Sequence, residues 1–177
     1  MKRKQWLVVC ATALAFSGCS TVGDVVPACA GKGVETTFLM TQSVPEAKYI
    51  PCIEAMPAGW SIDTLDVKSS GSRFSFSLDR AGVGALQMRL EPRCDVSGAE
   101  RLPSDEPGTR LWEEPFRLEE RYRASRYYLF PGGCVTYEFD LPQEEYTEAL
   151  SDIYIAFTFQ ERAELQRAYR DRFEVDH

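Results

Sequence analysis

The chain has 177 residues, of which 44% are hydrophobic and 27% are charged, and its formal net charge is −7. This length fits one ordinary domain, and the share of apolar residues excludes a wholly disordered chain. Lys2, Arg3 and Lys4 are the charged residues of 1–18, so the remaining residues carry −10. That charge argues against nucleic acid as a partner of the folded domain.

Residues 1–18 have the layout of an export signal. A basic segment, residues 1–5, precedes an apolar run of eleven residues, 6–16. Eleven residues in a helix span only about half of a bilayer core, so we do not expect a permanent membrane span.

The tetrapeptide Phe16-Ser17-Gly18-Cys19 resembles the lipobox of bacterial lipoproteins, with Phe16 where leucine is usual. The resemblance implies cleavage before Cys19, a lipid on its sulfur, and attachment to the extracytoplasmic side of the cell membrane. The alternative is an ordinary secretory signal, with Cys19 as a free or bridged thiol.

The cysteine count fits an exported protein. Cys10 would leave with the signal and Cys19 would carry lipid, which leaves an even number in an oxidising compartment. The remaining four, for which three pairings exist, are Cys29, Cys52, Cys94 and Cys134. We favour the pairs Cys29–Cys52 and Cys94–Cys134 because each pair flanks a self-contained β segment.

Residues 19–28 form a short polar tether, and a single domain is expected over residues 29–177. Residues 34–40 suit a strand because they contain threonines, phenylalanine and leucine. Residues 41–59 are interrupted by three prolines and are interpreted as loop or edge, with a short apolar piece at 52–56.

The middle of the chain has the alternating pattern of antiparallel strands. A strand is expected at 62–67, and apolar and polar residues alternate over 74–78 and 86–90. The glycine-containing reversal at 80–84 predicts a hairpin, and the turn at 68–72 extends it to a three-stranded meander.

A second hairpin is predicted at residues 127–141. Two apolar runs flank the break Pro131-Gly132-Gly133, and Val135, Tyr137, Phe139 and Leu141 alternate with polar residues.

The C-terminal part changes to a helical period. Apolar residues over 146–157 recur at helical spacing, and 158–161 has the form of a capping box that would start a second helix. Residues 153–159 are also rich enough in β-branched and aromatic residues to form a strand. The expected class is α+β: an antiparallel meander and hairpin with C-terminal helices on one face, stapled by disulfides.

Two segments hold candidate ligand groups. Clustered acids at 95–108 could offer oxygens to calcium, but the EF-hand spacing is absent and a solvated loop is favoured. No metal or cofactor is predicted.

The mixed aromatic and charged stretch 111–126 is expected to be a salt-bridged surface. The predicted contact residues in and after it are Trp112, Arg123, Arg126 and Tyr128. Alternatively, Trp112 and Tyr128 belong to the core and the arginines pair with nearby acids.

Histidine-based catalysis is not expected, since the single histidine is the last residue, His177. The leading hypothesis is a non-enzymatic lipoprotein that binds or scaffolds an envelope protein or glycan. The alternative is a carboxylate-based hydrolase of cell-wall glycan, for which Glu113 and Glu114 are an example of an acid pair.

Three motifs, at residues 92–95, 103–108 and 130–139, resemble a group of uncharacterised lipoproteins and membrane-associated proteins of actinobacteria. The resemblance covers roughly residues 85–175. It implies an extracytoplasmic domain tied by Cys94–Cys134, and it carries over no catalytic residue.

Overall fold

The computed structural model describes residues 26–118 and 120–174. The export signal, Cys19 and His177 lie outside these ranges. Within them, no helix is long and apolar enough to cross a bilayer.

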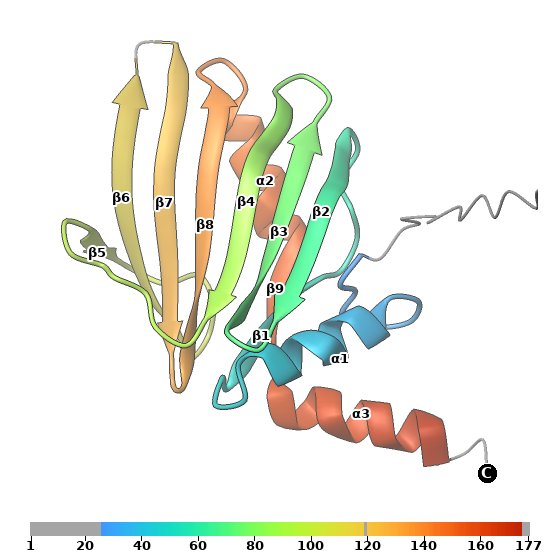
Figure 1. Ribbon diagram of the computed structural model, residues 1–177. Helices are drawn as coiled ribbons and strands as arrows, with labels where there is room; N and C mark the ends of the chain where they lie inside the picture. The colour runs from blue at the N-terminus through green and yellow to red at the C-terminus, as the bar shows by residue number, and fades with distance from the viewer. Residues whose placement is uncertain (1–25, 119, 175–177) are drawn as a thin grey trace, which may run out of the picture.

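The centre of the molecule is a seven-stranded antiparallel sheet with the order β2-β3-β4-β8-β7-β6-β5 (Figure 1). Its strands are β2 (Trp60–Lys68), β3 (Gly71–Leu78), β4 (Gly82–Glu91), β5 (Glu100–Leu102), β6 (Arg110–Leu118), β7 (Arg121–Phe130) and β8 (Gly133–Pro142). Both predicted hairpins are present: β3 pairs with β4, and β7 pairs with β8 from Arg121↔Pro142 to Phe130↔Gly133.

The remaining elements cover one face and one end of this sheet. They are α1 (Val34–Ser43), β1 (Tyr49–Ile53), α2 (Tyr146–Ala156), β9 (Phe157–Glu161) and α3 (Arg162–Glu174). Strands β1 and β9 pair as a separate two-stranded ribbon. In Figure 1, α2 lies behind the sheet, and α1 and α3 lie at its lower end. The predicted α+β class, with an antiparallel sheet and disulfide staples, is confirmed.

We call the sheet face that packs against α2 and the ribbon the inner face, and the opposite one the outer face. The ribbon contributes the rings of Phe157 and Phe159, which alternate along β9. Phe157 packs edge-on against Phe76 of β3 at 5.3 Å between ring centroids, and Phe159 lies 5.3 Å from Tyr128 of β7. The core therefore lies between the inner face, the ribbon and α2.

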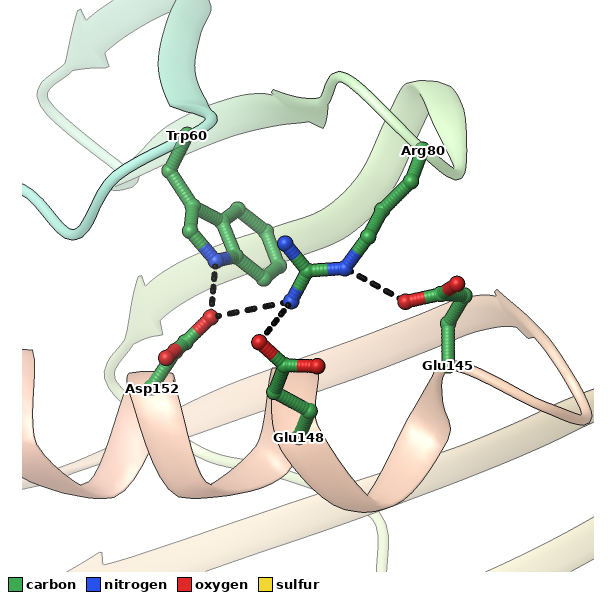
Figure 2. A network of polar contacts seen from close by, with 5 residues as sticks. All are labelled: Trp60, Arg80, Glu145, Glu148 and Asp152. Atoms are coloured by element: carbon green, nitrogen blue, oxygen red, sulfur yellow. Dashed lines mark hydrogen bonds and ion pairs between the residues drawn. The ribbon is translucent and has the colours of Figure 1, made fainter.

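Polar contacts fix α2 against one edge of the sheet (Figure 2). The indole Nε1 of Trp60 donates to Asp152 at 3.0 Å. The Arg80 guanidinium, in the β3–β4 turn, pairs with Glu145, with Glu148 at 3.1 Å and with Asp152 at 3.5 Å. One arginine thus contacts three acids along α2.

The prediction of a strand at 34–40 is wrong, because this segment is the helix α1. Thr36, Thr37 and Met40 are buried in it. The Thr37 hydroxyl donates to the Ala28 carbonyl at 2.7 Å, and the Phe38 ring stacks on Tyr169 of α3 at 3.8 Å. These tertiary contacts override the strand propensity of threonine and phenylalanine.

The second C-terminal helix is present, but the capping box predicted to start it at 158–161 is wrong. These residues belong to strand β9, and the last helix begins at Arg162. Residues 153–159, which could form a helix or a strand, form both: α2 ends at Ala156 and strand β9 begins at Phe157. Of the apolar piece expected at 52–56, Cys52 and Ile53 end strand β1, which begins at Tyr49, and residues 54–56 follow the strand.

Both favoured disulfides, Cys29–Cys52 and Cys94–Cys134, are confirmed. The second disulfide ties the segment 92–109 to strand β8, and we call this segment the edge wrap. Cys94 lies 3.2 Å from the Thr136 hydroxyl on the outer face, and β5 then pairs with β6 and forms the edge of the sheet. The wrap continues onto the inner face, where the Tyr128 hydroxyl donates to Asp105 at 3.3 Å.

Candidate functional site

The alternation of strand β7 divides the four predicted contact residues between two faces. Tyr128 is buried on the inner face and Arg126, two residues away, shares that face. Arg123 points to the outer face. Trp112 is opposite Tyr127 in the β6–β7 register and therefore also belongs to the outer face. These four residues do not form one site.

On the outer face, Arg123 is engaged by a carboxylate of the neighbouring strand. Its Nη2 lies 2.9 Å from Asp140, which Arg121 also contacts. Partial burial of Asp140 opposes ionisation, but hydrogen bonds from the two arginines outweigh it and lower the pKa of this carboxyl below its usual value. This part of the outer face is a salt-bridged surface, as the mixed charges of the sequence indicate.

On the inner face, Arg126 lies in a more enclosed setting. Its side chain is 11% exposed and forms an ion pair with Glu113 of β6, which is 17% exposed. It also donates to the Tyr154 hydroxyl of α2, and its guanidinium carbon lies 5.7 Å from the Phe139 ring centre. Arg126 thus joins the edge of the sheet to α2.

The part of the edge wrap that lies on the inner face contributes two further acids, Asp105 and Glu106, beside Arg126. The wrap approaches the ribbon at Gly108, which has a φ of +76°, and a Cβ built there would lie 2.3 Å from the Tyr49 hydroxyl oxygen. Glycine is therefore needed both for the conformation and for the close approach. Burial, followed by the charges of Asp105 and Glu54, raises the pKa of Glu106 to about 7. In the described part of the chain, no lysine or arginine forms an ion pair with Asp105 or Glu106.

Tyr137 of β8 lies beneath these acids. The residue is 4% exposed, and among the described residues its hydroxyl has no hydrogen-bond partner. Burial, and then the nearby Tyr128, Glu106 and Asp105, raise the pKa of this hydroxyl well above its usual value. A buried polar group without a partner costs about 1–3 kcal/mol, so its retention calls for an explanation.

These groups surround a small chamber between the inner face, α2 and the edge wrap. Its lining consists of Asp105, Glu106, Arg126, Tyr128, Tyr137, Phe139, Leu150, Ile153, Tyr154, Phe157 and Phe159. Its free space is about 10 Å³, which is close to the requirement of a single water molecule.

A larger, open hollow of about 600 Å³ adjoins the chamber. Asp105, Glu106 and Tyr154 belong to both linings, and the other residues of the hollow are Leu102, Pro103 and Leu111. The hollow is therefore mainly apolar, with two carboxylates where it meets the chamber. This shallow, solvent-open surface could contact the apolar part of a small organic molecule whose polar end lies in the chamber.

Of the predicted residues, Arg126 and Tyr128 line the chamber, whereas Trp112 and Arg123 do not. The sequence singled out Asp105 and Glu106 only as loop acids and Tyr137 only as a strand residue. The alternation of β8 indicates that Tyr137 is buried, but no local signal shows that its hydroxyl lacks a partner. Across the described ranges, no group of three or more histidine, cysteine or acidic residues could hold a metal ion.

Comparison with known proteins gives no family for the chain. No protein-family model and no curated protein matches it. A solved structure from Bacteroides thetaiotaomicron VPI-5482 is similar over 66% of this chain, with 11% identity and a TM-score of 0.38. The chain spans 46% of that structure's length.

Proposed function

We propose that the protein is a membrane-anchored, extracytoplasmic binding protein whose ligand occupies the hollow and the chamber on the inner face. The observation that carries this proposal is the junction between the two spaces. There, an apolar surface meets Asp105 and Glu106, which form no ion pair with a lysine or arginine of the described residues. The buried Tyr137 hydroxyl, in the wall of the adjoining chamber, has no hydrogen-bond partner among them. A buried hydroxyl without a hydrogen-bond partner destabilises the fold, and a ligand that bonds to the Tyr137 hydroxyl would relieve this cost.

The proposed location rests on the lipobox-like residues 16–19 and on the two disulfides, which form and persist in oxidising compartments. Feeding cells a clickable fatty acid tests the anchor. Cys19 should carry the label and Cys19→Ser should abolish it. An unlabelled protein, or a label that survives Cys19→Ser, would reject the lipid anchor.

Site-specific photocrosslinking in intact cells tests the binding surface. A photoreactive residue at Leu102, in the hollow, should give an adduct that mass spectrometry of the tryptic peptides detects. The matched control is Val83, which is 86% exposed at the start of β4, and which lines neither the hollow nor the chamber. Equal adducts at both positions, or none at Leu102, would reject the hollow as the binding surface.

A second candidate function is the hydrolysis of cell-wall glycan, and the raised pKa of Glu106 favours it. A carboxyl group with a pKa of about 7 can donate a proton to a leaving oxygen near neutral pH. If the protein hydrolyses glycan, its incubation with purified cell-wall glycan should produce new reducing ends. The Glu106→Gln variant should produce none. Unchanged glycan in the presence of the wild type would dismiss it.

A further inference from the structure

The acidic side chains that line the chamber are not matched by free cations of the same lining. Asp105 and Glu106 lie side by side on the edge wrap, and the charge of Glu54 acts on Glu106 from the end of β1. The one cation of the chamber lining, Arg126, is already paired with Glu113. Asp105 and Glu106 therefore line the chamber beside an arginine whose charge is balanced by another acid, and a further positive charge would be stabilised here.

The Tyr137 hydroxyl gives independent support. It is buried, lies in the wall of the chamber, and has no partner among the described residues. A hydroxyl oxygen accepts hydrogen bonds, so the chamber combines a free acceptor with two carboxylates. The aromatic rings of Phe157, Phe159 and Tyr154 complete the wall, and such rings attract organic cations.

The size of the chamber limits the cationic group. Free space of about 10 Å³ admits a group no larger than about one water molecule, which a primary ammonium matches and a guanidinium or a quaternary ammonium exceeds. The adjoining hollow of about 600 Å³ lies within the range of small-molecule sites and is lined by Leu102, Pro103 and Leu111.

We infer that the ligand is a small primary amine with an apolar body. Its ammonium group enters the chamber, where it donates hydrogen bonds to Asp105, Glu106 and the Tyr137 hydroxyl. Its apolar body lies in the hollow against Leu102 and Tyr154. This inference rests on the proposed binding function and specifies the chemistry of the ligand.

Calorimetric titration of the purified protein with four probes tests the chemistry. Hexylamine should bind with one-to-one stoichiometry. Hexanol has the same body without the charge, hexyltrimethylammonium has the charge on a larger head, and ammonium chloride lacks the body. Each control should bind at least about tenfold more weakly. Hexanol loses the charge-assisted hydrogen bonds, hexyltrimethylammonium has no N–H donor and exceeds the chamber, and ammonium chloride loses the apolar contact with the hollow. If any control binds as tightly as hexylamine, the assignment is wrong.

The same amine chemistry could come from a lysine side chain of a protein. Nα-acetyl-lysine methylamide represents this source, and it should bind more weakly than hexylamine because its backbone amides have no place in an apolar hollow. Tighter binding of the lysine derivative would overturn the assignment to a free amine.

Three variants locate the ammonium group. Tyr137→Phe removes only the unpartnered hydroxyl, so it should weaken hexylamine binding about tenfold without lowering the melting temperature. Glu106→Gln should weaken it at least as much. Glu144→Gln makes the same substitution at an exposed acid before α2, outside the chamber lining, and should bind hexylamine like the wild type. Unchanged binding in both Tyr137→Phe and Glu106→Gln would contradict the inference.

Failure of this inference is distinguishable from failure of the proposed function. If hexylamine does not bind but the photoreactive residue at Leu102 still forms adducts that Val83 does not, the hollow is a binding surface for another chemical class. If neither experiment gives a signal, both proposals fail.

Discussion

The two faces of the central sheet both hold arginine–carboxylate pairs, but they use them differently. On the outer face, Arg121 and Arg123 share Asp140, and the side chains involved are 37–43% exposed. On the inner face, Arg126 and Glu113 are 11% and 17% exposed, and Arg126 also contacts α2 through Tyr154. On the outer face the carboxylate lies between two arginines, whereas Asp105 and Glu106 of the edge wrap form no ion pair with a lysine or arginine of the described residues.

This difference has an energetic consequence. Exposed ion pairs contribute about 0–1 kcal/mol because solvent and salt screen them. A pair in an enclosed setting contributes little in net terms, but its disruption leaves a buried charge without compensation. The outer face should therefore tolerate change, and the inner face should respond strongly to the loss of one partner.

The largest effect is expected at Arg126. Arg126→Met leaves Glu113 without its partner in an enclosed site and should lower the free energy of unfolding by about 3–5 kcal/mol. Arg123→Met, in the exposed pair with Asp140, should lower it by less than about 1 kcal/mol. Urea denaturation of the two variants measures the contrast, and equal losses would refute the distinction between the faces.

The next effect concerns the disulfide that carries the edge wrap from the outer to the inner face. Cys94 and Cys134 are 40 residues apart in sequence, and a bridge over such a loop contributes about 2–4 kcal/mol. Replacing both by alanine should lower the melting temperature accordingly. Replacing Asp66 and Lys68, an exposed ion pair on β2, by alanine is the matched double variant and should have little effect. If the two double variants have the same melting temperature, the bridge does not stabilise the edge wrap.

A smaller effect is expected from Glu106, and it depends on pH. Its pKa is about 7 in the folded protein against a usual 4.5, so the folded state binds more protons than the unfolded state between these values. Stability should therefore fall as pH rises from about 4.5 to about 7. Glu106→Gln should flatten this part of the profile and raise the melting temperature at pH 8 by roughly 2–4 °C, the effect of about 1 kcal/mol in a domain of this size. A parallel profile in wild type and variant would exclude a raised Glu106 pKa.

Local sequence patterns predicted the sheet better than the helices. The alternation of Phe74, Phe76, Leu86 and Met88 and the glycine-containing breaks are local signals, and both hairpins formed as expected. Helix α1 was missed because its stabilising contacts, such as Phe38 on Tyr169, join residues far apart in the chain. Strand β9 was missed in part for the same reason, since Thr158 and Phe159 pair with Cys52 and Pro51 of β1.

The site was less predictable than the fold. The stretch 111–126 was interpreted as a mixed charged surface and not as strands, so Arg123 and Arg126 were grouped. In strand β7 their spacing of three residues places them on opposite faces. The chamber depends on the edge wrap reaching the inner face beside β8. That path is set by the Cys94–Cys134 bridge and the β5–β6 pairing together. No spacing in the sequence shows that Asp105 and Glu106 meet Tyr137.

The central claim is an excess of negative charge in the inner-face chamber. Its most direct test is a pH titration of the Glu106 side-chain carboxyl, monitored by carbon-13 NMR. Comparison with Glu106→Gln assigns the resonance. We expect a midpoint near pH 7 in the free protein, which falls when hexylamine is present at saturation because a bound cation favours the ionised form. A midpoint near 4.5 in the free protein, unmoved by hexylamine, would contradict the claim.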